Sequence, residues 1–126
     1  MIWIMQIEAI NTNQDIDQIQ ELLFQNYSKA PYNGTWTKET VLQHVKDLEQ
    51  PCKDYAFKAV MYDKIVGIIY AMPQCWPKGW ILNIVHCHVA KEFQDQNVGT
   101  KLYEHVKTLA NEKGFEKITL HSHKDA

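Results

Sequence analysis

The stretch from Gln94 to Lys101 has the residue types and spacing of an anion-binding loop. It follows an apolar run and leads into a segment of helical periodicity. Asn97 tolerates a left-handed backbone, and Gly99 allows a ligand to approach the main chain closely. The first N–H groups of a helix have no partner inside it, and the helix dipole favours negative charge there. Thr100 and Lys101 would add a hydroxyl and a positive charge, so the loop is suited to a diphosphate.

The charge composition favours recognition of such an anion by the main chain. The chain has 126 residues and a formal net charge of -2, and all 13 of its basic residues are lysines. Without arginine, no guanidinium group is available to hold a phosphate through two parallel hydrogen bonds. The chain also lacks the strongly basic balance of a nucleic-acid-binding protein, so we expect no nucleic acid partner.

Apolar periodicity predicts the strands and helices that would position the loop. Strands are expected over residues 2–10, 54–62, 65–72, 80–89 and 115–121, and helices over 14–29, between Thr37 and Pro51, and over 98–113. The last strand-helix-strand unit implies a right-handed parallel crossover. The resulting order β-α-α-β-β-β-α-β predicts an α/β fold, with a mixed sheet and helices packed on its faces.

Residues with special backbone preferences predict where these elements end. Thr12 or Asn13 would cap the first helix, and Gly114 would end the last one. Residues 62–64 are expected to form a hairpin turn that makes the flanking strands antiparallel. The proline-rich segment 73–78 is expected to be a loop.

Size and composition predict a single domain over residues 1–126. Hydrophobic residues make up 45% and charged residues 22% of the chain, as in ordinary soluble proteins. Cys52, Cys75 and Cys87 are an odd set without metal-ligand spacing, which favours free thiols in a reducing compartment. The apolar start Met1–Met5 is too short for a signal peptide or a membrane span, so we expect a cytoplasmic protein without a membrane partner.

The loop resembles the coenzyme A (CoA) signature of the Gcn5-related N-acetyltransferase (GNAT) family, written Gln/Arg-x-x-Gly-x-Gly/Ala. Here it reads Gln94-Asp95-Gln96-Asn97-Val98-Gly99. The element order is also the family's order, and Val89, Phe93 and Leu102 match the pattern around the loop. The stretch from Ala30 to Thr37, followed by the strand that begins at Ile65, is similar to the aminoglycoside-type branch of the family.

The resemblance implies a cosubstrate, acetyl-CoA, and the residues that hold it. Cys87 and Val89 would offer backbone groups to the pantetheine arm and the thioester carbonyl. The remaining cofactor residues would surround the diphosphate; they are Gln94, Gln96, Asn97, Val98, Gly99, Thr100 and Lys101.

The resemblance also implies direct attack of a primary amine on the thioester, helped by a general base. His86 falls where relatives often carry a glutamate base, and an imidazole with an ordinary pKa of about 6.5 suits that role. His88 shares the face of His86 by strand alternation and is the weaker candidate. Tyr32 and Trp36 would form aromatic walls of the acceptor pocket for a small-molecule amine. The alternative is that each of these side chains is purely structural.

Metal binding is the rival chemistry for the histidines. His86 and His88 form one His-x-His pair, and His121 and His123 form a second pair on the last expected strand. Four imidazoles on neighbouring strands could bind zinc. Because no carboxylate or cysteine completes a usual ligand set on that face, we predict no metal site.

Three departures from the family pattern leave a second function open. Asn97 replaces the first glycine of the signature, and Asp95 puts a carboxylate where glycine is usual, so its side chain must face solvent. Family members normally continue with a helix and two more strands, whereas this sequence ends at Ala126. Either the sequence is a piece of a longer chain, or a shortened domain covers the gap by self-association, which we expect as a homodimer in which strands could be exchanged. The alternative function is a non-catalytic CoA-binding or swapped-dimer remnant.

Overall fold

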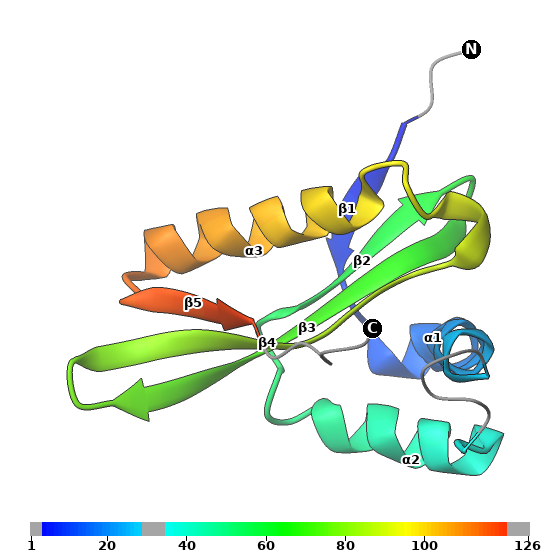
Figure 1. Ribbon diagram of the computed structural model, residues 1–126, viewed down its shortest axis with the longest axis horizontal. Coiled ribbons are helices and arrows are strands. Elements are labelled where there is room, and N and C mark those ends of the chain that lie inside the picture. The colour runs from blue at the N-terminus through cyan, green and yellow to red at the C-terminus, as the bar shows by residue number, and fades with distance from the viewer. Residues whose placement is uncertain (1–3, 29–34, 121–126) are drawn as a thin grey trace.

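The computed structural model describes residues 4–28 and 35–120 (Figure 1). In this part of the chain the elements follow the expected order β-α-α-β-β-β-α-β. They are β1 (Gln6–Ala9), α1 (Thr12–Tyr27), α2 (Lys38–Leu48), β2 (Ala56–Met61), β3 (Lys64–Trp76), β4 (Gly79–Val89), the short 3₁₀ helix η1 (Lys91–Phe93), α3 (Val98–Lys113) and β5 (Lys117–Leu120). The predicted fold class is therefore confirmed.

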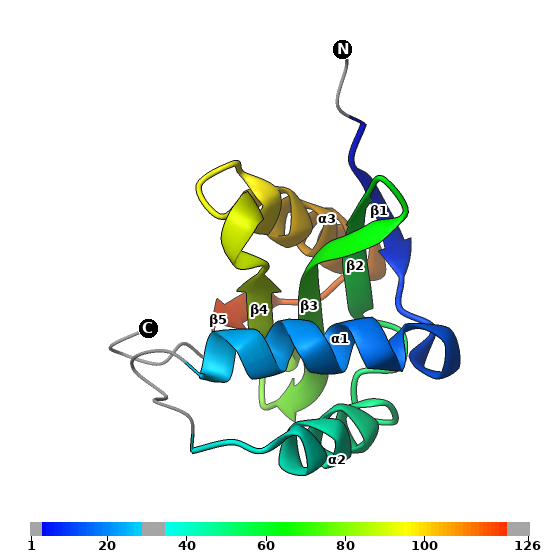
Figure 2. The same ribbon diagram turned by 90° about the vertical axis from the view of Figure 1, so that its right-hand side faces the viewer.

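The five strands form one mixed sheet in chain order. Neighbouring strands are antiparallel except for β4 and β5, which are parallel and are connected through α3. Helices α1 and α2 cover one face of the sheet and α3 covers the other (Figures 1 and 2). Two separate clusters of buried apolar side chains fill these two interfaces. Side chains that alternate along a strand therefore enter different chemical environments.

Local capping explains where the helices begin and end. The side chain of Asn11 accepts a hydrogen bond from the Gln14 N–H and caps α1, one residue earlier than expected. Thr37 caps α2, as predicted, in a reciprocal capping box with Thr40. Gly114 ends α3 in the left-handed conformation, also as predicted.

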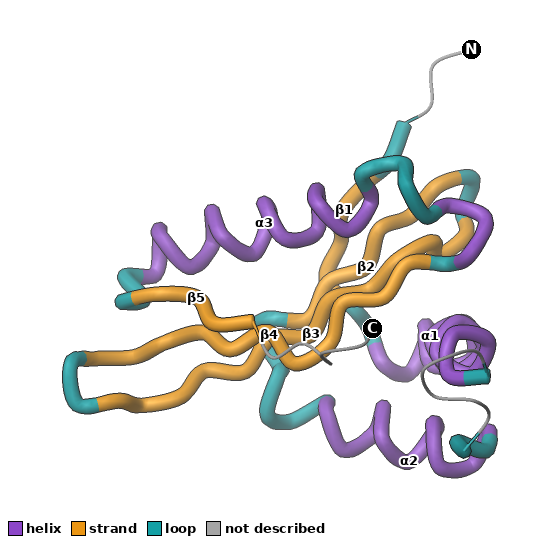
Figure 3. The backbone as a smooth tube through the Cα atoms, viewed as in Figure 1, coloured by secondary structure: helices purple, strands orange, loops and turns teal. Residues whose placement is uncertain are grey.

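The hairpin between β3 and β4 is longer than the sequence indicates. Residues 73–76 belong to β3, so the predicted loop over 73–78 is wrong, and only a short turn remains (Figure 3). Strand β2 pairs with β3 only as far as Tyr70. Beyond that point one edge of β3 has no strand beside it among the described residues, and an edge position tolerates the missing N–H of Pro73. The predicted turn between β2 and β3 is confirmed, with Tyr62 and Asp63 both at positive φ.

A buried ion pair fastens α1 to the sheet. The two carboxylate oxygens of Asp15 lie 2.9 and 2.8 Å from the Nζ of Lys58 on β2. The Asn11 N–H also donates to this carboxylate, over 2.8 Å. Since Asp15 is only 5% exposed, the pair needs these partners to offset the loss of hydration. This contact joins the first turn of α1, which carries part of the site described below, to β2 and adds to the apolar packing of the helix.

A glycine on β3 sets how closely the start of α3 approaches the sheet. A Cβ atom at Gly67 would lie 2.8 Å from a methyl carbon of Val98 and 3.3 Å from the carbonyl oxygen of His88. Both distances are shorter than ordinary contacts, so only glycine fits here without displacing α3. The first turn of α3 is therefore held directly against β3 and the end of β4.

Candidate active site

The loop between β4 and α3 presents main-chain N–H groups at the start of α3. Asp95 and Asn97 both adopt the left-handed conformation, with φ of 65° and 66°. Asn97 occupies the N-cap position but makes no side-chain capping hydrogen bond, unlike the caps of α1 and α2. The first helical hydrogen bond runs from the Lys101 N–H to the Asn97 carbonyl, over 3.0 Å. The N–H groups of the preceding turn therefore face outward at the positive end of the helix dipole.

One edge of β4 is open beside this loop. Among the described residues, β5 pairs with β4 only from Ile81 to Ile84. The Ala90 N–H donates to the Val66 carbonyl on β3, over 2.8 Å. Since alternate residues of an antiparallel ladder direct their N–H and C=O groups to opposite sides, Cys87 and Val89 direct theirs away from β3, toward the open edge.

The open edge and the helix start form one continuous surface. A Cβ atom at Gly99 would lie 3.7 Å from a methyl carbon of Val89 and 3.9 Å from the Sγ of Cys87. Three predicted cofactor residues from two elements therefore meet. Val98 is buried against the sheet and can offer a ligand only its main chain, whereas Thr100 and Lys101 lie on the first turn of α3.

Two of the predicted loop residues support the protein's own main chain. The Gln94 side chain donates to the Val89 carbonyl over 3.1 Å, and the Asn26 side chain donates to the same oxygen over 3.2 Å. The Gln96 side chain donates to the Glu92 carbonyl over 3.1 Å. These amides hold the loop in shape, so their side chains are less suited to direct ligand contact than the sequence suggests.

A bulge in β4 determines which face of the sheet receives His86. The β3–β4 register shifts between Tyr70 and Ala71, which leaves Val85 as the extra residue. Ile84 packs in the cluster under α3, whereas Val85 packs in the cluster under α1 and α2. Without the extra residue, His86 would follow the alternation of Ile84 and enter the α3 side. The bulge instead places it beneath α1 and α2.

Three aromatic or imidazole side chains, from α1, α2 and β4, lie against His86, and a fourth, Trp36 from the segment before α2, packs on one of them. The Nε2 atoms of His86 and His44 are 2.7 Å apart, and the Tyr27 hydroxyl lies 3.5 Å from the Nδ1 of His86. The ring centroids of His86 and His88 are 5.5 Å apart. Trp36 stacks on Tyr27, with a centroid separation of 4.9 Å. We name Tyr27, Trp36, His44, His86 and His88 the histidine cluster.

Sequence reasoning predicted three members of the histidine cluster and missed Tyr27 and His44. His44 could have been identified from the helical spacing of the sequence. It lies three residues after Val41 and four before Leu48, and therefore next to the apolar face of α2. Tyr32, His121 and His123 lie outside the described residues. Within the described ranges, no group of three or more His, Cys, Asp or Glu side chains is arranged to hold a metal ion.

Burial keeps two of the three histidines in the cluster neutral. The pKa of His88 is lowered to about 4, mainly by desolvation and further by the nearby imidazole of His44. Desolvation also lowers the pKa of His44, an effect that the charge of Asp47 partly opposes. At neutral pH these two imidazoles therefore add no positive charge to the space beside His86.

The lowered pKa of His88 predicts acid lability of the fold. The unfolded chain binds a proton at this residue below about pH 6.5, whereas the folded chain resists protonation until about pH 4. Stability should therefore fall as the pH drops through this window, by about 2 kcal/mol at pH 5 relative to pH 7. Urea unfolding at both pH values would measure this, and His88→Leu should remove most of the difference. An equal loss in both proteins would contradict the prediction.

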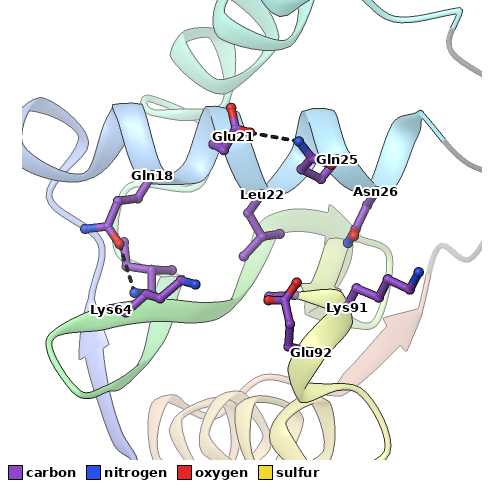
Figure 4. Close-up of a pocket in the computed structure, with 10 residues that line it drawn as sticks. Gln18, Glu21, Leu22, Gln25, Asn26, Lys64, Lys91 and Glu92 are labelled. Carbon is purple, nitrogen blue, oxygen red and sulfur yellow. Dashed lines mark hydrogen bonds between the residues drawn. The ribbon is translucent and has the colours of Figure 1, made fainter.

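A hollow lies between α1, the start of β3 and η1 (Figure 4). Its volume is about 310 Å³. The polar side chains of Gln18, Glu21 and Lys64 line one part, and η1 contributes Lys91 and Glu92. None of the residues that the sequence predicted for a site lines this hollow. It borders the loop, however, through Lys91 and Glu92 and through Asn26, whose side chain donates to the Val89 carbonyl.

Comparison with known proteins identifies the family of this chain. The model of the acetyltransferase (GNAT) family matches residues 16–126. The chain belongs to the GNAT family. The prediction of an N-acetyltransferase is confirmed at this level. A comparison with curated proteins gave no match.

Solved structures show the GNAT fold across the chain. A possible acetyltransferase from Clostridium difficile 630 has a TM-score of 0.79 at 19% identity, over 95% of this chain and 80% of that one. An aminoglycoside N-acetyltransferase in complex with CoA has a TM-score of 0.70 at 16% identity, over 98% and 80%. A ribosomal-protein-alanine N-acetyltransferase from Brucella melitensis biovar Abortus 2308 has the same TM-score and identity, over 98% and 82%. No helix in the described part of this GNAT chain is long and apolar enough to cross a membrane.

Proposed function

We propose that this GNAT protein transfers an acetyl group from acetyl-CoA to a primary amine of a small molecule. The observation that carries the proposal is the joining of an outward-facing helix start to an open strand edge, at Gly99, Cys87 and Val89. The main-chain N–H groups before Lys101 would hold the diphosphate. The open edge of β4 would hold the pantetheine arm by main-chain hydrogen bonds, as an added strand does. The Val89 carbonyl is not one of these groups, because it already accepts from Gln94 and Asn26.

The amine would enter on the side of the histidine cluster. Its nitrogen attacks the thioester carbonyl, a C–N bond forms, the C–S bond breaks, and the sulfur leaves as a thiol after it gains a proton. An ammonium group has no lone pair, so the bound amine must first lose one proton, and His86 is the proposed acceptor of that proton, directly or through one water molecule. A second proton leaves the nitrogen as the amide forms, and it balances the proton that the sulfur gains. Trp36, which stacks on the buried ring of Tyr27 and is itself only partly buried, provides an aromatic surface that favours a cationic amine before it is deprotonated.

Three loop residues are proposed to make no direct contact with the ligand through their side chains. Asp95 lies in the left-handed conformation and is exposed, which agrees with the expectation that its carboxylate faces solvent. Gln94 and Gln96 are proposed to support the loop through their bonds to main-chain carbonyls. Tyr32 stays a proposed wall of the acceptor pocket on the basis of the family resemblance alone.

Release of free thiol in the presence of acetyl-CoA and amines tests this proposal. We expect turnover with at least one amine from a panel of an aminoglycoside, a polyamine and a peptide with a free N-terminus. CoA alone should raise the melting temperature, since ligand at 100 times its Kd adds about 2.7 kcal/mol of stability. Stabilisation without any turnover would favour the CoA-binding remnant, and neither effect at millimolar CoA would reject both functions. Light scattering on the same sample tests the proposed homodimer.

A further inference from the structure

The contact between His44 and His86 restricts where protons can reside. At 2.7 Å, one Nε2 atom must carry a hydrogen and the other must offer a lone pair. The two rings are nearly perpendicular, with an interplanar angle of 86° and a centroid separation of 4.8 Å. Both imidazoles cannot be cationic in this arrangement, because two N–H groups would then face each other. The pair can therefore take up one extra proton only.

We propose that His44 is a positioning residue that accepts the Nε2–H of His86 and so makes Nδ1 the basic nitrogen of His86. This inference rests on the proposed acetyl transfer. His44 reaches His86 from α2, while Nδ1 of His86 lies on the side of Tyr27, on α1. The Tyr27 hydroxyl is 3.5 Å from Nδ1, too long for a strong hydrogen bond but compatible with an O–H directed at a lone pair.

Proton balance gives His44 a defined role during the reaction. When Nδ1 of His86 accepts the proton of the amine, the ring becomes cationic and its Nε2–H bond to His44 becomes charge-assisted. Such bonds are stronger than neutral ones, so His44 stabilises the protonated form of His86 more than the neutral form. The proton stays on His86 until it is passed to solvent or to the leaving sulfur.

Four residues of the described part of the chain face His86 or pair with it. Tyr27 faces it from α1, His44 from α2 and His88 from β4, while Tyr70 is its pairing partner on β3. Burial raises the pKa of the Tyr70 hydroxyl well above its usual range, so this residue remains neutral. Burial lowers the pKa values of His44 and His88, which favours a neutral imidazole at His44 and hence its role as an acceptor.

Two variants of His44 separate positioning from a structural role. In His44→Leu the acceptor is lost, and we expect kcat to fall at least about 10-fold and the acidic limb of the kcat–pH profile to move to lower pH. In His44→Gln an amide oxygen can accept the hydrogen bond, so part of the rate and the original position of the limb should return. Gln43→Leu, an exposed change on the same helix, should leave the profile unaltered. Equal losses in the Leu and Gln variants with an unmoved limb would overturn the inference.

A second measurement tests the proposed hydrogen bond from His86 to His44 independently of turnover. Nitrogen-15 NMR of the imidazoles at neutral pH reports which ring nitrogen carries hydrogen. We expect hydrogen on Nε2 of His86 in the unchanged protein and a mixture of both forms in His44→Leu. Hydrogen on Nδ1 of His86 in the unchanged protein would overturn the inference even if the enzyme turns over. If the NMR result is as expected but no amine is acetylated, the proposed function fails and the hydrogen-bond assignment stands.

Discussion

Gly99→Glu is expected to abolish CoA binding while the fold persists. A Cβ atom at this position makes only ordinary contacts, at 3.7 and 3.9 Å, so the backbone can accept a side chain. Gly99 has no positive φ, so the substitution adds no backbone strain. The longer glutamate side chain, however, must extend over Cys87 and Val89, along the proposed path of the pantetheine arm. Its carboxylate would also lie near the diphosphate and repel it.

Isothermal titration with CoA measures the effect. We expect the Kd to rise at least about 100-fold, which corresponds to about 2.7 kcal/mol of binding free energy. Two control variants distinguish the effect of the glutamate at position 99 from that of any side chain there and from that of added charge elsewhere on α3. Gly99→Ala adds a methyl group in ordinary contact and should weaken binding only slightly, and Thr108→Glu adds the same charge on an exposed, later turn of α3. Unchanged affinity in Gly99→Glu would show that the diphosphate does not bind at the start of α3.

The sequence predicted the backbone of the loop and the helix after it well, because the information for both is local. The need for left-handed backbone at Asn97, the close approach at Gly99 and the helical period of α3 all reside within 20 residues. Asp95 was expected to be an unfavourable replacement of glycine. The structure shows that it occupies a second left-handed position, which aspartate tolerates better than most residues do.

The histidine cluster was harder to predict because it depends on contacts between distant segments. His44 and His86 are 42 positions apart, and Tyr27 and His86 are 59 apart. The bulge at Val85 has no clear sequence signal, yet it decides which face of the sheet His86 occupies. Strand alternation alone correctly put His86 and His88 on one face, but it could not say which face.

The long hairpin shows the opposite error, in which a local rule was applied too strongly. Proline favours loops, but Pro73 lies on a strand whose other neighbour has already ended. The extent of β2, which lies earlier in the chain, was the missing information. Local signals therefore predicted the order of the helices and strands. Long-range packing determined the lengths of the strands and the face of the sheet on which each side chain lies.

His86→Ala is expected to lower kcat by about 100-fold or more, within the usual range for loss of a general base. Alanine leaves room for water, which can still accept the proton but far less effectively. The rate of the unchanged enzyme should show an acidic limb, because a protonated imidazole cannot take the proton of the amine. In the variant this acidic limb should flatten, since the group that titrates is absent. Measuring kcat with the best amine of the panel between pH 5 and 9 would show both effects.

Binding measurements separate this variant from Gly99→Glu. His86 lies on the α1 and α2 side of the sheet, whereas Gly99 contacts the open edge from the α3 side, so His86→Ala should leave the Kd for CoA unchanged. His105→Ala provides a matched control, because this exposed histidine packs against Phe57 on the α3 side, away from the histidine cluster. It should retain both the rate and the pH profile. A His86→Ala enzyme with a reduced rate but an unaltered acidic limb would show that His86 shapes the acceptor pocket and that another group removes the proton.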